Sequence, residues 1–164
     1  MHMTQPLSSW TMPILRFGMG VFIAAWGLDK LMATAVGQHI FSGAYSVHLG
    51  ATLVQVAGVA EIVLGLALAV GLLRVVAAWL VLALNLASTL SVWRQILDPW
   101  GAIGLTHGDG VNHLFLASIV IVAASVVLVL NARDDTATLD RRLGISPARV
   151  DRSPAAAAVP TVRP

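Results

Sequence analysis

Four apolar stretches, each long enough to cross a lipid bilayer, occupy most of the 164-residue chain. They run over residues 12–32, 52–71, 75–97 and 112–131. A membrane-crossing helix needs about 20 mostly apolar residues, since each residue adds about 1.5 Å towards a hydrocarbon thickness of about 30 Å. With 57% hydrophobic and 11% charged residues, the chain has too little polar sequence to cover a water-soluble domain. We therefore expect an all-α integral membrane protein.

Short connections between the spans favour an up-down-up-down bundle of four transmembrane helices. An even number of spans puts both termini on one side of the membrane. Six of the ten Lys and Arg residues follow Asn131, and Arg74 lies in the turn between the second and third spans. Because Lys and Arg accumulate in cytoplasmic segments, both termini are predicted to be cytoplasmic.

The two ends of the chain differ from the spans in composition. Residues 1–11 form a cytoplasmic or interfacial leader, which lacks Lys and Arg and is therefore a poor signal peptide. Residues 132–164 are rich in Arg, Ala and Pro and contain several Asp. Such a segment buries too little apolar surface to fold alone, so we expect it to be disordered unless a partner binds it.

Composition also excludes several kinds of chemistry. The sequence contains no cysteine, which excludes thiol–disulfide exchange, thiolate zinc sites and iron–sulfur clusters. The arginines of the tail alternate with aspartates and form no basic stripe with aromatics, so nucleic-acid binding is not expected. The partners to expect are the lipid bilayer and other membrane-protein subunits.

Small residues recur in the first two spans at spacings that favour close helix packing. Gly20 and Ala24 lie one turn apart in the first span, and Gly58 and Gly65 lie in the second. In lipid, small residues let helices approach closely where no hydrophobic force drives them together. We therefore expect these residues to face neighbouring helices.

Charged residues within the spans need an explanation, because each costs about 2.5–3.5 kcal/mol near the bilayer centre on insertion scales. Glu61 lies halfway along the second span. One stripe of the first span, which should face the bundle interior, consists of Arg16, Gly20, Ile23, Gly27 and Lys30. From this stripe the Arg16 guanidinium is expected either to reach Glu61 or to extend to the headgroups.

Three interpretations of these polar residues stay open. The first is a structural polar network that fixes helix register, made of Arg16, Lys30, Glu61, Asn85 and Arg94. The second is a proton- or quinone-handling site in which Glu61 titrates beside Arg16. The third is a neutral, protonated Glu61 without a partner.

Histidines gather in the segments expected on the outer side of the membrane. His107, Asp109 and His113 are candidate metal ligands, although their spacing matches no recognised ligand pattern. The alternative is a structural or partner-facing role. No cofactor follows from the sequence, and quinone and lipid are the ligands compatible with it.

Three segments of the first two spans combine glycines with charged residues: ILRFGMGVF (14–22) and WGLDKL (26–31) in the first span, and GVAEIVLG (58–65) in the second. The first two segments resemble the opening of the DoxX family of small bacterial membrane proteins, and the third resembles the second span of that family. Arg16, Lys30 and Glu61 match its polar positions. The resemblance implies a four-helix protein of the bacterial inner membrane, in a family with some members linked to quinone-reducing thiosulfate oxidation.

These observations favour an accessory or structural subunit of a larger membrane complex, of the electron-transfer kind, over an enzyme. The alternative is a quinone-reactive oxidoreductase subunit that uses a buried Glu61–Arg16 pair. A small transporter is a third hypothesis, disfavoured because four spans enclose little room and no inverted repeat or broken helix is evident.

Overall fold

The computed structural model describes residues 10–106, 112–135 and 137–145, and all regular structure in these ranges is helical. In chain order the elements are α1 (Thr11–Met32), α2 (Thr34–Tyr45), α3 (Ala51–Val70), α4 (Arg74–Ser91), α5 (Trp93–Leu97), the 3₁₀ helix η1 (Asn112–Leu116), α6 (Ala117–Asn131) and α7 (Leu139–Arg142).

Four of these segments are long and apolar enough to cross a membrane: α1, α3, α4, and η1 with α6. The predicted all-helical fold with four spans is therefore confirmed. The third span was expected to run to Leu97, but α4 ends at Ser91. There the Ser91 hydroxyl donates to the Ser88 carbonyl, and Val92 leaves the helical conformation with φ −108° and ψ 24°. Such side-chain bonds compete with the helical backbone pattern, and the short α5 follows the break.

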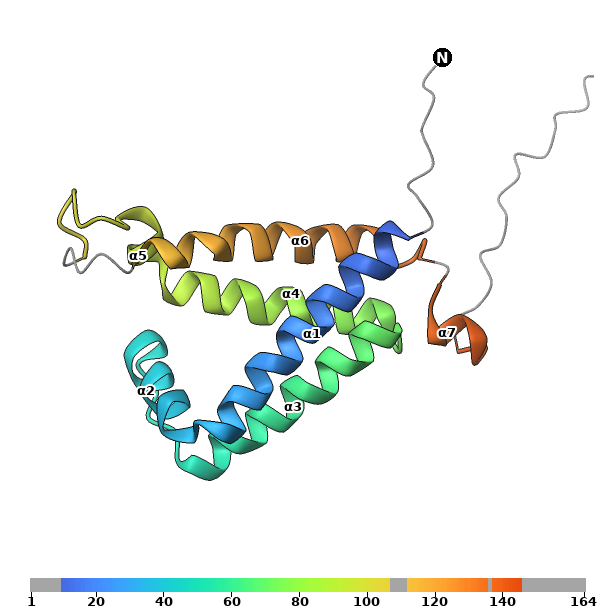
Figure 1. The fold of residues 1–164 in the computed structure, drawn as a ribbon, viewed down its shortest axis with the longest axis horizontal. Coiled ribbons are helices and arrows are strands. Elements are labelled where there is room, and N and C mark those ends of the chain that lie inside the picture. The colour runs from blue at the N-terminus through green and yellow to red at the C-terminus, as the bar shows by residue number, and fades with distance from the viewer. Residues whose placement is uncertain (1–9, 107–111, 136, 146–164) are drawn as a thin grey trace, which may run out of the picture.

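The spans form two pairs, α1 with α3 and α4 with α6, which meet at one end and diverge towards the other (Figure 1). We call the end where the two pairs meet the terminal end, because α1 begins there, α3 turns into α4 there, and α6 ends there. The other is the loop end, which carries α2 and α5. Both ends of the helical region thus lie on the same side of the bundle, as an up-down-up-down arrangement requires.

Reciprocal glycine contacts join α1 to α3. A Cβ atom added to Gly20 would lie 2.5 Å from the Gly65 carbonyl oxygen, and one added to Gly27 would lie 2.5 Å from that of Gly58. The two glycines of each helix are seven residues apart, about two helical turns, so both pairs fall on one contact face. The backbones touch directly, and close packing of this kind is what holds helices together in lipid.

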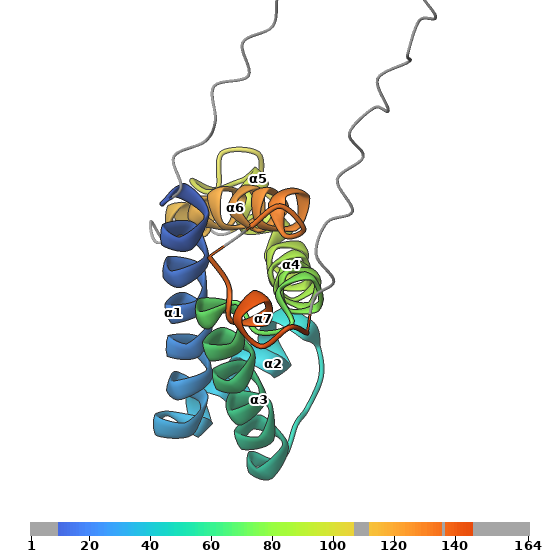
Figure 2. The ribbon, with the colours of Figure 1, turned by 90° about the vertical axis from the view of Figure 1, so that its right-hand side faces the viewer.

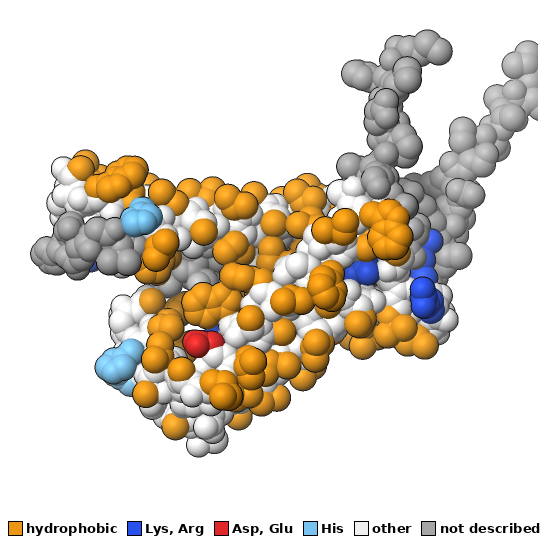
Figure 3. Space-filling view, viewed as in Figure 1, with side chains coloured by type: hydrophobic (Ala, Val, Ile, Leu, Met, Phe, Trp, Pro, Cys, Tyr) orange, Lys and Arg blue, Asp and Glu red, His pale blue; other side chains and the backbone are white. Residues whose placement is uncertain are grey.

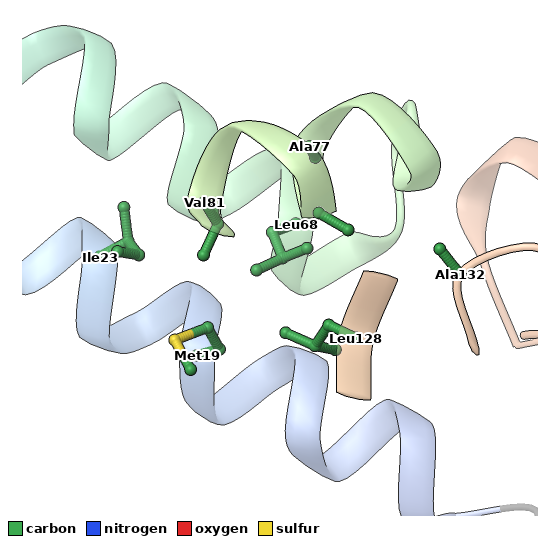
Figure 4. Packing of buried hydrophobic residues seen from close by; sticks show 8 residues of the cluster. Met19, Ile23, Leu68, Ala77, Val81, Leu128 and Ala132 are labelled. Carbon is green, nitrogen blue, oxygen red and sulfur yellow. The ribbon is translucent and has the colours of Figure 1, made fainter. Parts of the chain in front are cut away.

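A small apolar core lies where all four spans meet. It combines side chains of every span, as Figure 4 shows: Met19 and Ile23 of α1, Leu68 of α3, Ala77 and Val81 of α4, and Leu128 of α6, with Ala132 just beyond. On the outside, large apolar side chains such as Val63, Leu66 and Val120 are exposed. A protein surrounded by water would bury such side chains, whereas lipid solvates them.

Helix α2 occupies most of the first connection at the loop end. Gly37 of α2 packs against Val54 of α3, since an added Cβ at Gly37 would lie 2.7 Å from the Val54 side chain. The Gln38 amide donates to the Leu49 carbonyl at 3.0 Å. Ser46 ends the helix in the left-handed conformation, with φ 55°. The connection thus packs against α1 and α3.

The glycine contacts generate a prediction about stability. Gly20→Ala is expected to lower the free energy of unfolding by about 1–3 kcal/mol, because the atoms that its methyl would meet, the Gly65 oxygen and the Ala69 nitrogen, are backbone atoms that cannot rotate away. The matched control is Gly18→Ala in the same helix, where an added Cβ has no heavy atom of another described helix within 4 Å.

The free energy of unfolding of both variants is measured by circular dichroism on the purified protein in mixed micelles. Because the change in helix propensity is the same, the difference between them reports the contact with α3. Equal stabilities for the two variants would contradict the proposed backbone contact.

Candidate functional site: charged residues within the bundle

Arg16 lies in the second turn of α1, near the terminal end, and its side chain is buried, with 5% of the residue exposed. Its Nη1 forms an ion pair with the Asp135 carboxylate. Its Nη2 donates to the Ala137 carbonyl at 2.7 Å, and its Nε donates to the Ala69 carbonyl at 3.2 Å. The guanidinium therefore uses all three nitrogens, and two of its partners come from the segment after α6. It reaches neither Glu61 nor open solvent.

Arg74 and the start of α4 bind a second carboxylate from the same segment. Asp140 accepts hydrogen bonds from the backbone nitrogens of Leu73 at 2.7 Å and Arg74 at 2.9 Å. The Arg74 Nη1 lies 3.5 Å from the same carboxylate, and its Nε donates to the Ala132 carbonyl at 2.7 Å. The first amides of a helix lack partners within it, and Leu73 has no polar side chain to supply one. Asp140 thus caps α4 from 66 residues away.

Gly71 makes room for this segment at the end of α3. It adopts φ 73°, and the backbone nitrogens of Gly71 and Leu72 donate to the Leu68 and Ala67 carbonyls, the Schellman arrangement. A Cβ at Gly71 would lie 2.8 Å from the Thr138 side chain, and the Gly71 carbonyl accepts from the Asp140 nitrogen at 3.2 Å. Only glycine fits both the conformation and the space.

We call residues 132–135 and 137–145 the tail clamp. It runs from the end of α6 across the ends of the spans, so that α7 lies in front of them when the molecule is seen from the terminal end (Figure 2). The sequence predicted disorder from residue 132 onward unless a partner bound. In the structure the bundle's own arginines hold the tail clamp, while residues 146–164 lie outside the described residues.

Lys30 and Glu61 form an ion pair between α1 and α3. The Lys30 Nζ lies 2.7 Å from the Glu61 carboxylate, and the side chains are 14% and 16% exposed. Helical side chains tilt towards the N-terminus, so Lys30 extends from the loop end towards the middle of the bundle. Its ammonium also lies 5.7 Å from the centre of the Trp26 ring. Arg16 was one of the expected partners of Glu61, and in the structure the partner is Lys30.

Asn85 joins α4 to α6. Its Nδ2 donates to the Ser125 hydroxyl at 2.8 Å, and that hydroxyl donates to the Ile121 carbonyl, also at 2.8 Å. The same nitrogen lies 3.7 Å from the Met19 sulfur of α1. Both Asn85 and Ser125 are buried. Hydrogen bonds of this kind between membrane helices contribute about 0.6 kcal/mol on average.

The five residues predicted as one network therefore take part in separate contacts. Arg16 binds the tail clamp, Lys30 binds Glu61, and Asn85 binds Ser125. Arg94 lies in α5 at the loop end, exposed and 5.4 Å from the Trp93 ring. Sequence reasoning missed Asp135, Asp140 and Ser125. Two arginines at the ends of apolar spans require two anions, and this requirement was the available signal for the aspartates.

The histidines give no metal centre in the described part of the chain. His113 lies exposed in η1, and the other two candidates, His107 and Asp109, lie outside the described residues. Within residues 10–106, 112–135 and 137–145, no group of three or more His, Asp or Glu could hold a metal ion. His39 and His48 line an open pocket of about 400 Å³ between α2 and Leu49.

Asp98 organises the loop after α5. Its carboxylate accepts from the backbone nitrogens of Ile103 at 3.3 Å, Leu105 at 2.8 Å and Thr106 at 3.2 Å. Burial alone would raise the pKa of Asp98, but these hydrogen bonds outweigh it and lower the pKa below its ordinary value of 3.8. The carboxylate therefore stays ionised and serves the loop backbone.

A model of the DoxX family matches residues 11–94, which span α1 to the start of α5. The matched region contains both members of the Lys30–Glu61 pair. It also contains Arg16, Arg74 and Asn85, whereas their partners Asp135, Asp140 and Ser125 follow it. No curated protein and no solved structure matches the chain significantly.

The Arg16–Asp135 pair generates a double-mutant prediction. Arg16→Leu and Asp135→Leu are each expected to destabilise the protein by about 3–5 kcal/mol, because each leaves a buried charge without its partner. The double variant removes both charges, so its loss should be smaller than the sum of the single losses by about 1–3 kcal/mol.

The coupling energy between Arg16 and Asp135 is obtained from the free energies of unfolding of the wild type, the two single variants and the double variant in mixed micelles. Arg94→Leu combined with Asp135→Leu is the control, since Arg94 lies at the opposite end of the bundle and should contribute additively. Additive losses for the Arg16 and Asp135 variants would show that the two side chains do not interact.

Proposed function

Because this chain belongs to the DoxX family of small membrane proteins, we propose that it is an accessory, structural subunit of a larger membrane complex, of the electron-transfer kind. The observation that carries this proposal is the use of the charged residues within the spans. Arg16 and Lys30 are each engaged in an ion pair that joins parts of this chain. Groups used in this way hold a scaffold together.

The composition supports a role without redox chemistry of its own. The sequence has no cysteine, so its partners must supply any thiol, thiolate-metal or iron–sulfur chemistry. The exposed faces of the spans give such partners ample surface. On α6, for example, Ile119, Val120 and Leu130 are all exposed. Family members linked to quinone-reducing thiosulfate oxidation add the electron-transfer part of the proposal.

We further propose that the protein resides in the bacterial inner membrane with the terminal end in the cytoplasm. The described tail clamp has Arg133, Arg141 and Arg142 exposed at that end. At the loop end the described helices carry Arg94 and the partly buried Lys30. The excess of arginine at the terminal end agrees with the positive-inside rule.

This proposal predicts that the protein migrates within a larger assembly when its native membrane is solubilised in a mild detergent. Native electrophoresis with detection of an epitope-tagged chain measures the size. The same membranes in dodecyl sulfate are the control, where the tagged 17.2 kDa chain should migrate alone. Migration as a lone chain in the mild detergent, with no co-purifying protein, would contradict an accessory role.

One observation favours a second candidate, a quinone-reactive oxidoreductase subunit. The Lys30–Glu61 pair lies among apolar residues of α1 and α3 and stays partly exposed. A carboxylate and an ammonium at lipid depth are groups that can exchange protons with a quinone held between helices. The pair that supports this candidate is Lys30 with Glu61, in place of the predicted Arg16 with Glu61.

Under this second candidate, Glu61→Gln should lower quinone-dependent turnover by at least about tenfold, because the amide keeps the shape of the carboxylate and cannot take up a proton. Membrane vesicles supplied with a soluble quinone allow the rate to be measured. Asp29→Asn is the matched control, since Asp29 is an exposed carboxylate next to Lys30. Unchanged turnover in Glu61→Gln would remove the quinone hypothesis.

A further inference from the structure

The tail clamp separates its charges between an inner and an outer face. Its described residues include three aspartates and three arginines, so their formal charges sum to zero. Asp135 and Asp140 are 6% and 2% exposed and bind Arg16 and Arg74 of the bundle. The arginines at positions 133, 141 and 142 are exposed, and among the aspartates of the clamp only Asp134 is exposed with them. Folding therefore makes the outer face positive.

Apolar side chains accompany the arginines on this outer face. Leu143 is 59% exposed and Ile145 is 51% exposed, directly after Arg141 and Arg142. A surface that faced only water would gain nothing from exposing two large aliphatic side chains next to two cations. A mixture of this kind is typical of segments that lie in the membrane interface, where cations meet phosphates and aliphatic groups enter the acyl boundary.

The tail clamp also lies at the depth where headgroups begin. The Asp140 nitrogen donates to the carbonyl of Gly71, which directly follows α3, and the Asp140 carboxylate caps α4. Helices α3 and α4 are spans, so their ends mark the boundary of the hydrocarbon region. Figure 3 shows Lys and Arg side chains gathered with apolar ones at this end of the molecule.

From these observations we propose that the outer face of the tail clamp is a membrane anchor that binds acidic phospholipid headgroups. Arg141 and Arg142 contact the headgroup phosphates, and Leu143 and Ile145 enter the lipid beside them. The buried aspartates have a definite part in this arrangement, because their ion pairs with Arg16 and Arg74 stop them from cancelling the positive charge. This proposal holds whether or not the protein is an accessory subunit of a larger complex.

The lack of cysteine in the sequence allows a direct test. The full chain with Leu143→Cys is labelled at that single site with an environment-sensitive fluorophore. It is reconstituted in vesicles of phosphatidylcholine alone or of phosphatidylcholine mixed with phosphatidylglycerol. We expect the label to emit at shorter wavelength, and to be quenched by a lipid-borne quencher, in the acidic vesicles. Added salt should reverse the shift, because it screens the charges.

Paired substitutions show which residues carry the effect. Arg141→Gln with Arg142→Gln should lower the ratio of lipid-inserted to water-exposed label by about fivefold for each arginine lost. Arg141→Lys with Arg142→Lys keeps the charges and should retain the dependence on acidic lipid. Arg94→Gln is the matched control, since Arg94 is also an exposed arginine but lies at the loop end. Circular dichroism checks that every variant keeps its helix content.

Three results would overturn the proposal. The first is the same emission and quenching in both kinds of vesicle. The second is an unchanged signal in the Arg141→Gln, Arg142→Gln variant, or an equal loss in Arg94→Gln. The third is a shift that requires an added soluble protein, which would identify this face as a protein-binding surface instead.

Discussion

The low polarity of the lipid is the constraint on which the rest of this structure depends. A charged side chain within a span has little water to solvate it, so the protein must supply its counter-charge. Arg16, Arg74 and Lys30 each bind a carboxylate of the same chain. Two of these carboxylates come from beyond the last span. The chain therefore folds back on the bundle, and a segment with almost no apolar core of its own acquires a fixed position.

Packing and ion pairing reinforce each other between α1 and α3. The close approach at Gly27 and Gly58 brings the base of the Lys30 side chain against α3, since a Cβ added to Gly58 would lie 3.0 Å from the Lys30 Cβ. At that separation the ammonium reaches Glu61 with a single hydrogen bond. Larger residues at the glycine positions would move the two charges apart in a medium that solvates neither of them. The glycines thus serve the electrostatics as well as the packing.

The spans could be predicted from sequence because length and apolarity are local properties. The inward stripe of α1 was predictable for the same reason, and Arg16, Gly20, Ile23 and Gly27 are all buried. The partners of its charges were not predictable, because Arg16 and Asp135 are 119 residues apart and helical periodicity does not extend across loops. Alternating Asp and Arg in the tail also resembled a solvated segment, whereas the fold separates these charges onto two faces.

One of the three ion pairs lies within the region that the family model matches, and the other two join that region to the tail clamp. Within residues 11–94 the contact between α1 and α3 is complete, since Lys30, Glu61 and all four contacting glycines lie inside it. The same region leaves Arg16, Arg74 and Asn85 dependent on Asp135, Asp140 and Ser125, which follow it. The tail clamp therefore completes the charge balance of the matched region, and α6 supplies the hydrogen-bond partner of Asn85. A DoxX-like chain with a different C-terminal segment must meet the same requirement at these positions with other anions, or lack the arginines.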